Sequence, residues 1–439
     1  MGKFWLIEKK KRGSVVADYT GYLNDLRHTT VLGINPPVRD FAFFDFWAKP
    51  LGLLYLLQAL REGGNRVFLL DCLQQAREKD LSWGRLRPRR QKIEKPLPYR
   101  NIPRNYYHFG LTEEEFLKAL KGYPSPDLIC LTSGMTYWYP GVSWCLSLIR
   151  AVFPDVPILL GGIYPRLCPE HAASLGADMV QTVPCSLQGE YPAMDLYSSL
   201  GYAVTRSTLG CPMRCEYCAS RILDPAFSLR KMSQIEEEIS RQRELFSVKD
   251  VAFYDDALLA VKEGHFYPLC ERLRSTFPEL RYHTPNGLHV RQIDATCAQV
   301  LFDTNFQTLR LSLESVDPQV QQCSSSKVAL EEYRRAVAAL REAGFSREQI
   351  ETYVLVGLPE QSPESVLHTL EYIESQGGKA KTAQFSPIPG TSSFEKAAER
   401  VPEIRREPLL HNNSVFAPYF GKYLTPEELQ QIKNRAKAP

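Results

Sequence analysis

The chain of 439 residues alternates short apolar runs with longer amphipathic runs, and this alternation occurs in two successive blocks. Short apolar runs bounded by Gly, Pro or polar residues are typical of buried strands, and the longer runs have the period of helices. Strands that alternate with helices predict parallel sheets covered by helices. We therefore expect an α/β protein with two sheet-forming blocks.

The first block, residues 29–184, resembles a doubly wound sheet of the flavodoxin type. A helix over Leu51–Glu62 is closed by Gly63-Gly64, and a helix over Glu113–Lys121 begins with the capping box Thr112–Glu115. The strands that the pattern predicts are Val31–Asn35, Arg66–Asp71, Asp127–Ser133, Pro157–Gly162 and Asp178–Thr182.

An irregular stretch rich in Arg, Lys and Pro separates Asp71 from Asp127. It is too long for an ordinary connection, so we interpret it as an insertion that covers the sheet or as a partly mobile lid. Its basic residues between Arg85 and Arg104 are the one candidate for a nucleic-acid contact. A solvated charged loop is the favoured interpretation, and no nucleic-acid partner is expected.

The second block, residues 203–391, predicts a partial (β/α)6 barrel of the TIM type. A capping box at Ser233–Glu236 and the pair Ser362-Pro363 mark two helix starts. Its predicted strands are Ala203–Ser207, Asp250–Tyr254, Tyr282–Thr284, Thr308–Ser312, Ile350–Leu355 and Thr382–Ser386. The remaining parts are an N-terminal extension (1–28), a connector (185–202) and a small C-terminal helical extension (392–439) with a helix after the Thr425–Glu428 capping box.

Composition limits the class of protein. The net charge is +3, 44% of residues are hydrophobic and 23% are charged, as in a globular protein without a polybasic surface. Residues 1–12 are basic but no apolar segment follows them, and no apolar run is long enough to span a bilayer. We expect a cytoplasmic protein with no membrane partner. The 11 cysteines fit a metal site and buried thiols better than a disulfide framework.

Three of these cysteines, Cys211, Cys215 and Cys218, form a C-x3-C-x2-C motif directly after the first strand of the second block. Thiolates are soft ligands that suit zinc or iron–sulfur sites. A structural zinc ion needs four ligands, and the nearest histidines, His171 and His265, are distant in sequence. Three thiols without a local fourth ligand favour a [4Fe–4S] cluster with one open iron. The alternatives are zinc completed by a distant cysteine and chance clustering.

This motif resembles that of the radical S-adenosylmethionine (SAM) superfamily, and Tyr217 matches the aromatic residue before the family's last cysteine. The resemblance implies a [4Fe–4S] cluster whose open iron binds SAM. The reduced cluster then cleaves SAM to a 5′-deoxyadenosyl radical, which abstracts hydrogen from the substrate. It also implies a reductant such as flavodoxin or ferredoxin as a partner.

The same resemblance assigns SAM contacts to the ends of the later strands, where loops form the active face of a barrel. It places the SAM amino group near the second strand end, the ribose and carboxylate near the fourth, and adenine near the fifth. The residues implied are Tyr254, Asp255, Asp256, Asn286, Ser312, Glu314, Val356 and Gly357. A solvated turn is the alternative for the adjacent acids.

The first block resembles the cobalamin-binding domain that precedes the barrel in one subclass of this superfamily. Small residues leave room at the carboxyl edge of the sheet, where open α/β sheets bind ligands. The candidate cobalamin contacts are Asn35, Pro36, Thr132, Ser133, Gly134, Gly161, Gly162 and Tyr164. Tight turns and packing in the crevice are the alternative roles.

One motif of many cobalamin proteins, D-x-H-x-x-G, is absent, because Cys72, Leu73 and Gln74 follow Asp71. Relatives in the subclass often lack this histidine too, so its absence does not exclude cobalamin. The sequence therefore favours a radical SAM enzyme that uses cobalamin to methylate an unactivated carbon of a small molecule, a peptide or a protein side chain.

Two other functions stay open at this point. One is a hydrogen abstraction that starts a rearrangement or cyclisation, without net methylation or without cobalamin. The other is a non-enzymatic iron–sulfur protein for electron transfer or sensing.

Overall fold

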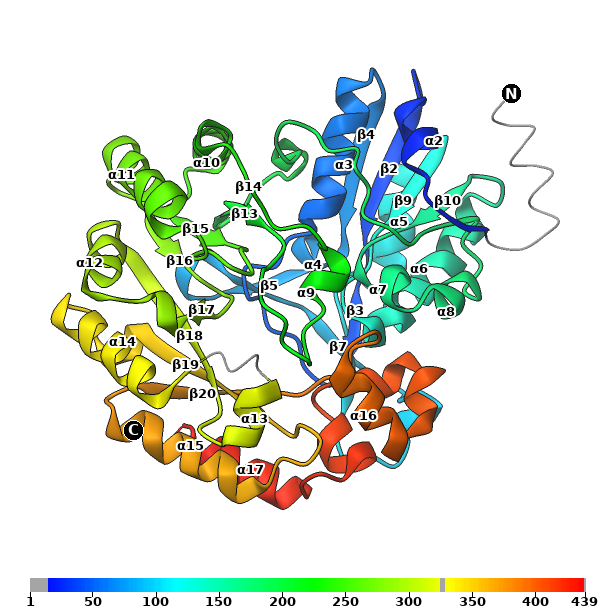
Figure 1. Cartoon of the computed structure of the whole chain (residues 1–439). Helices are drawn as coiled ribbons and strands as arrows, with labels where there is room; N and C mark the ends of the chain where they lie inside the picture. Colours follow the sequence, from blue (N-terminus) through cyan, green and yellow to red (C-terminus); the bar gives the residue numbers. More distant parts are fainter. Residues whose placement is uncertain (1–14, 324–327, 438–439) are drawn as a thin grey trace. The chain divides into compact units, whose positions relative to one another are not determined.

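The computed structural model describes residues 15–323 and 328–437 of the chain (Figure 1). The chain divides into two compact units. The first contains the chain up to Leu200 together with a short later segment, Arg406–Leu410. The second contains Gly201–Arg405 and the chain from His411 onward.

A parallel sheet with the strand order β1-β11-β10-β9-β2-β4 forms the centre of the first unit. Its strands are β1 (Val15–Ala17), β2 (Thr30–Asn35), β4 (Arg66–Asp71), β9 (Leu128–Leu131), β10 (Ile158–Leu160) and β11 (Met179–Gln181). Apart from β1, the strands lie in the order of a flavodoxin-type sheet, 2-1-3-4-5 by chain position. The predicted doubly wound fold is therefore confirmed.

Strand β1 extends this sheet from a segment for which the pattern predicts no strand. Val15–Ala17 pairs in parallel with Met179–Gln181, and the Gln181 side chain accepts a hydrogen bond of 2.7 Å from the Tyr19 amide. Three residues are too few to show a strand period, so only the exposed edge of β11 reveals this pairing.

The helices of the first unit pack around the buried side chains of β2, β9 and β10. They are α2 (Thr20–Asn24), α3 (Leu51–Glu62), α4 (Cys72–Gln75), α5 (Glu113–Gly122), α6 (Tyr139–Val152), α7 (Ile163–Leu167) and α8 (Pro169–Ala173). Helix α3 has its predicted bounds. The capping box of α5 is present, because Thr112 and Glu115 bond each other's backbone amides.

The long insertion after β4 carries strands of its own. β5 (Arg77–Asp80) pairs with β6 (Leu86–Pro88), and β8 (Tyr106–Phe109) joins β3 (Val38–Asp40) and β7 (Arg90–Ile93) in an antiparallel sheet. Several of its basic side chains have protein partners: Arg89 pairs with Glu115, Arg90 stacks on Tyr107 and Arg104 stacks on Phe41.

A second parallel sheet, in the order β12-β15-β16-β18-β19-β20, forms the second unit, with β17 paired to β18. Its strands are β12 (Ala203–Thr205), β15 (Asp250–Phe253), β16 (Arg281–His283), β17 (Leu288–His289), β18 (Phe306–Glu314), β19 (Ile350–Val356) and β20 (Lys379–Gln384). Consecutive strands are neighbours and run parallel, which confirms the predicted partial barrel.

The helices of the second unit lie between these strands or follow them, and several cover the outside of the sheet (Figure 1). They are α9 (Ser220–Leu223), α10 (Met232–Phe246), α11 (Tyr267–Thr276), α12 (Ala295–Asp303), α13 (Pro318–Cys323), α14 (Leu330–Glu342), α15 (Pro363–Ser375), α16 (Ser392–Arg400) and α17 (Pro426–Arg435). No helix in the described ranges is long and apolar enough to cross a bilayer.

Two of the three helix starts that the sequence predicts in the second unit are confirmed. Ser362 caps α15 through the Ser365 amide, and Thr425 and Glu428 form the box that opens α17. The predicted box at Ser233–Glu236 is wrong, because α10 begins at Met232 and Lys231 is its N-cap residue, without a side-chain hydrogen bond. Ser233 therefore lies inside the first turn.

The carboxyl edge of the first sheet contains a close backbone approach between the ends of β9 and β10. Gly162 has φ 98° and ψ −160°, and a Cβ at this position would lie 2.3 Å from the Ser133 carbonyl oxygen. Ser133 Oγ donates to the Gly161 carbonyl at 2.9 Å, and the Ile163 amide donates to the Ser133 carbonyl at 3.0 Å. Only glycine fits position 162.

We predict that Gly162→Ala lowers the free energy of unfolding by about 2 kcal/mol or more, since alanine would be strained there and would also clash. The adjacent Gly161→Ala is the control, because no atom lies within 4 Å of the place that its Cβ would take. It should stay within about 0.5 kcal/mol of the wild type. Urea unfolding followed by circular dichroism measures both, and equal stability of the two variants would contradict the prediction.

Candidate functional site

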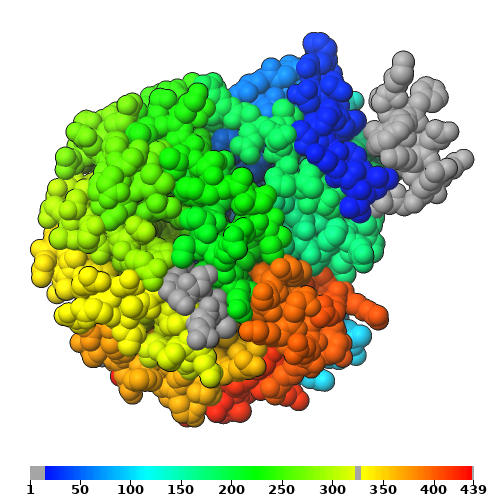
Figure 2. Space-filling model, in the orientation of Figure 1, coloured from blue at the N-terminus to red at the C-terminus, as the bar shows by residue number. Residues whose placement is uncertain are grey.

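A cavity of about 740 Å³ opens in the second unit, at the carboxyl ends of its strands. All three cysteines of the motif line it, and so do five other residues that the sequence singled out: Tyr217, Asp256, Asn286, Ser312 and Glu314. In Figure 2 the green segment that contains the cysteine loop lies at the surface of the face shown. The fold thus brings side chains from separate strand ends to one place.

The cysteine loop leaves the sheet through a short strand pair. β13 (Thr208–Leu209) leads into the loop and β14 (Ser228–Leu229) leads out of it, antiparallel to β13. Gly210 has φ 69°, and a Cβ there would lie 2.7 Å from the Ala226 carbonyl oxygen. Inside the loop, the Cys218 amide donates to the Cys215 carbonyl at 3.2 Å. Glycine therefore lets the chain turn where the cysteines begin.

The donor set of the loop suits a cluster better than a single ion. In the ranges that the structure describes, no three His, Cys, Asp or Glu side chains converge as the ligands of one metal ion do. A four-iron cluster binds each thiolate to a different iron, so its ligands need not converge on one point. Cys211 and Cys215 are half-buried and Cys218 is exposed. Three thiols on one loop thus fit a [4Fe–4S] cluster.

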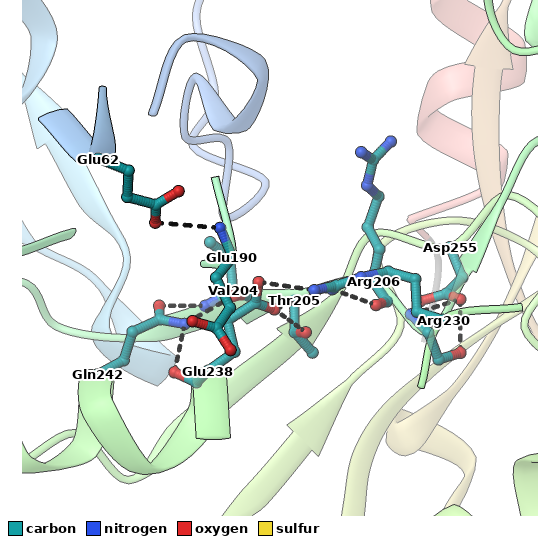
Figure 3. A network of polar contacts seen from close by, with 10 residues as sticks. Glu62, Glu190, Val204, Thr205, Arg206, Arg230, Glu238, Gln242 and Asp255 are labelled. Atoms are coloured by element: carbon teal, nitrogen blue, oxygen red, sulfur yellow. Dashed lines mark hydrogen bonds and ion pairs between the residues drawn. The ribbon is translucent and has the colours of Figure 1, made fainter. Parts of the chain in front are cut away.

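The buried carboxylate of Asp255 contacts the residues that lead into this loop (Figure 3). Asp255 Oδ1 accepts hydrogen bonds from the amide and hydroxyl of Ser207 at 2.9 and 2.6 Å. The same oxygen accepts from the amide and hydroxyl of Thr208 at 2.6 and 2.8 Å. Burial raises the pKa of Asp255, and these hydrogen bonds oppose that effect. The carboxylate is thus turned toward the chain before the cysteines, and it does not line the cavity.

A second buried carboxylate, Glu238 on α10, holds the exit of the loop (Figure 3). Arg230 forms a two-pronged ion pair with it, with both N–O distances 3.0 Å, and also donates to the Arg206 carbonyl at 2.7 Å. Thr205 donates to the same carboxylate, so Glu238 joins β12 to the residue that follows β14. Two buried acids therefore fix the two sides of the loop.

Asp256, next in the chain to Asp255, faces the cavity. The Asn286 amide donates to its carboxylate at 3.2 Å and to the Tyr254 carbonyl at 3.1 Å. Loss of water around Asp256 raises the pKa of its carboxyl, and the nearby acids Asp224 and Asp255 add to this effect. The side chains of Asp256 and Asn286 thus form a polar pair at the end of β15 that suits a cationic amino group.

Ser312 and Glu314 line the cavity from the end of β18. Gly287 lies against Ser312, and a Cβ there would be 2.0 Å from Ser312 Oγ. Glu314 has φ 68° at a point where the register of β18 and β19 shifts. A non-glycine residue in this region is strained, and such strain is common at functional sites.

Other candidate SAM contacts lie away from the cavity. Val356 is 1% exposed and packs in the barrel core, and Gly357 lies against Ala417 instead. Strand alternation gives the reason, since Tyr353 and Leu355 on the opposite face of β19 line the cavity. Tyr254 contributes its backbone, whose amide bonds the Thr205 carbonyl at 2.8 Å.

Part of the cavity wall was not predicted from the sequence. The period of two that groups Ser312 with Glu314 also groups Tyr353 with Leu355, so this signal was available. The loops carried no comparable pattern. The further lining residues include His289, Gln292, Gln384, Phe385, Ser386 and Thr391.

The candidate cobalamin contacts gather at the carboxyl edge of the first sheet. Asn35, at the end of β2, donates to the Asp71 carboxylate at 3.0 Å. The Thr132 amide donates to the Ile34 carbonyl at 3.0 Å, and Pro36 is buried. Asp71 also caps α4 and accepts a bond of 2.7 Å from the Tyr197 hydroxyl. This carboxylate is therefore used to tie β2, β4 and α4 together.

Aromatic side chains fill part of the same edge. Trp138 lies 2.9 Å from where a Cβ on Gly134 would be, and its indole donates to Asp40 at 2.8 Å. Tyr164 is fully buried, bonds His171 and stacks with Tyr139. These aromatic side chains therefore pack against other side chains of the first unit.

The rest of the edge is open and apolar. Met135 and Ile163, after β9 and β10, are 46% and 36% exposed, and Gly161 between the strand ends has open space above it. Binding sites for large ligands are mostly apolar with a few polar groups, and this edge fits the face of a large ring. The loop after β4 contains no histidine, so a cobalt-containing ring at this edge would receive no imidazole ligand from that loop.

Structural comparison finds the same two-part fold in known enzymes. The TsrM radical SAM methyltransferase from Kitasatospora setae, with cobalamin and [4Fe–4S] cluster bound, matches with a TM-score of 0.62 and 14% identity over 86% of this chain and 79% of its own. Its complex with tryptophan and a SAM analogue gives 0.61 and 15%, over 86% and 77%. The cobalamin-dependent radical enzyme OxsB gives 0.58 and 12%, over 88% of this chain and 57% of its own.

At the level of sequence, no curated protein matches this chain. Residues 205–373 match the Radical SAM superfamily, and this range contains the three cysteines and the ends of β15, β16, β18 and β19. The family implies a [4Fe–4S] cluster and SAM as its cofactors. Residues 205–373 of the second unit therefore form a radical SAM domain.

Proposed function

We propose that the protein is a radical SAM enzyme that uses cobalamin to transfer a methyl group to an unactivated carbon. The observation that carries the proposal is the cavity in which three thiols and polar side chains from three further strand ends meet. The first unit, with the fold found in cobalamin-dependent relatives, supports the cobalamin part.

In this proposal each part of the cavity has one task. Cys211, Cys215 and Cys218 hold the cluster, which supplies the electron for reductive cleavage of SAM. Asp256 and Asn286 bind the SAM amino group, and Ser312 and Glu314 bind its ribose and carboxylate. The lining also contains apolar side chains, including Leu258, Leu259 and Phe385, which keep water away from a reactive radical. An external one-electron reductant is needed.

Cobalamin would lie on the carboxyl edge of the first sheet, where Gly161, Met135 and Ile163 leave an open apolar surface. Bound there, it supplies the methyl group, and the chain contributes position and exclusion of water. The substrate is a small molecule, a peptide or a protein side chain.

A second candidate is hydrogen abstraction that starts a rearrangement or cyclisation without cobalamin. Trp138 over Gly134 and the buried Tyr164 favour it, because they occupy part of the edge that cobalamin would use. In that case the first unit recognises the substrate.

We predict that Cys218→Ala abolishes formation of 5′-deoxyadenosine from SAM, because two thiolates cannot hold a cluster with one open iron. Cys168→Ala, a half-buried cysteine of the first unit, is the matched control and should keep wild-type activity. Anaerobic incubation with dithionite followed by chromatography measures the product. Wild-type product levels from Cys218→Ala would refute the cluster assignment.

We predict that the anaerobic protein retains about one equivalent of cobalamin per chain after incubation with hydroxocobalamin and gel filtration. A variant with all three loop cysteines replaced by alanine should retain the same amount, since the corrin site belongs to the first unit. The corrin absorbance measures retention. A wild-type protein without the corrin absorbance bands would favour the second candidate.

We also predict that turnover produces S-adenosylhomocysteine together with 5′-deoxyadenosine, because methyl transfer consumes one SAM for each product. The cobalamin-loaded protein is supplied with fractions of a small-molecule extract, dithionite and methyl-deuterated SAM. Mass spectrometry should find a product that carries the label. If 5′-deoxyadenosine accumulates without S-adenosylhomocysteine in every active fraction, the reaction is not methylation.

A further inference from the structure

We infer that Asp255 is a positioning residue that sets the place of the cluster, and that its neighbour Asp256 alone of the two acids contacts SAM. The inference rests on the proposed function. It gives different tasks to two adjacent acids that the sequence does not distinguish. The observation behind it is the set of buried hydrogen bonds that Ser207 and Thr208 donate to Asp255, the residue labelled beside Arg206 and Arg230 in Figure 3. We use "loop base" for Ser207, Thr208 and Arg230, the residues at the entry and exit of the loop.

The loop base is fixed from the entry side by Asp255. The carboxylate is 4% exposed and Ser207 and Thr208 are 0% and 2% exposed, so water does not compete for these bonds. Two amides and two hydroxyls donate to Oδ1, and the Ser207 amide also donates to Oδ2 at 3.0 Å. Bonds to a charged acceptor are stronger than neutral ones, and burial makes their loss costly. Asp255 therefore holds the backbone just before Gly210 and Cys211 in one position.

Two further sets of contacts hold the loop base. The Ser207 carbonyl accepts from the Arg230 amide at 2.9 Å and lies 3.2 Å from His265 Nε2. Glu238 holds the Arg230 side chain through both of its oxygens. The loop base thus has no freedom to shift without breaking several buried bonds, and Asp255 is the acceptor at its centre.

The cluster depends on this base because the base fixes the chain where it enters and leaves the loop, while within the loop the Glu216 carbonyl accepts from the Ser393 amide at 3.1 Å. The three cysteines are half-buried or exposed, and Pro212 and Arg214 between them are exposed. Three thiols must meet three irons at one time, so a small displacement of the loop base moves all of them together. A ligand set that is held before the metal arrives binds it with less loss of chain entropy.

Asp256 differs from Asp255 in each of these respects. Its carboxylate faces the cavity and accepts hydrogen bonds from Asn286 and from Ser220, which lies within the loop after Cys218 but outside the loop base. Removal of this side chain leaves the hydrogen bonds of Ser207 and Thr208 to Asp255 in place. The two adjacent residues therefore form a matched pair for a test.

The test compares Asp255→Ala with Asp256→Ala after anaerobic reconstitution of the full chain with iron and sulfide. We expect Asp255→Ala to retain less than half of the wild-type iron and to form 5′-deoxyadenosine at least about tenfold more slowly. Asp256→Ala should retain more iron than Asp255→Ala, and the electron paramagnetic resonance spectrum of its reduced cluster should no longer change on addition of SAM. Asp255→Asn keeps Oδ1 as an acceptor but places an amino group where Oδ2 lies 3.0 Å from the Ser207 amide, so it should recover only part of the iron.

Two controls separate a positioning role from loss of the fold. Thermal unfolding of the metal-free chains measures stability, and the double variant Ser207→Ala/Thr208→Val, which keeps Asp255 and both amides, should lose iron to an intermediate extent. Wild-type iron content in both Asp255→Ala and the double variant would overturn the inference. So would equal iron loss in Asp256→Ala and Asp255→Ala. Absence of iron from the wild-type protein would instead refute the proposed function.

Discussion

Hydrogen bonds from Ser207 and Thr208 to the buried carboxylate of Asp255 connect the end of β15 to the chain that enters the cysteine loop. Strand β12 has three residues and lies at the end of the strand order, next to β15, so it is too short to carry the loop by itself. The carboxylate therefore extends the contact between the two strands past the last backbone pair. The thiols that line the cavity follow this junction in the chain.

The barrel gathers the rest of the site by a single geometric rule. Its strands run parallel, so every carboxyl end opens on the same side, and each following loop contributes to that side. Asn286 spans from the loop after β16 to the end of β15, and Gly287 lets that loop approach Ser312 on β18. Neighbouring strand ends thus support one another, and the polar groups of the cavity are held before any cofactor binds.

The first unit uses the same rule with different side chains. The ends of β2, β4, β9 and β10 meet at one edge, where Gly162 allows contact between two backbones. Part of the edge is packed with aromatic side chains and part is open. The Asp71 carboxylate accepts hydrogen bonds from Asn35 and Tyr197. A large ring can bind at such an edge by shape and apolar contact, without a histidine from the loop after β4.

The sequence by itself determined the two α/β blocks, most strand positions and the three thiols, because periodicity, caps and ligand spacing are local properties. It also placed Asp256, Asn286, Ser312 and Glu314 at strand ends. It did not separate Asp255 from Asp256, or Val356 from Leu355, since only the orientation of a strand against its neighbours decides which side chain faces the cavity. Strand β1 and the strands of the insertion also depended on tertiary pairing: short segments become strands when a partner edge supplies hydrogen bonds that their own sequence cannot specify.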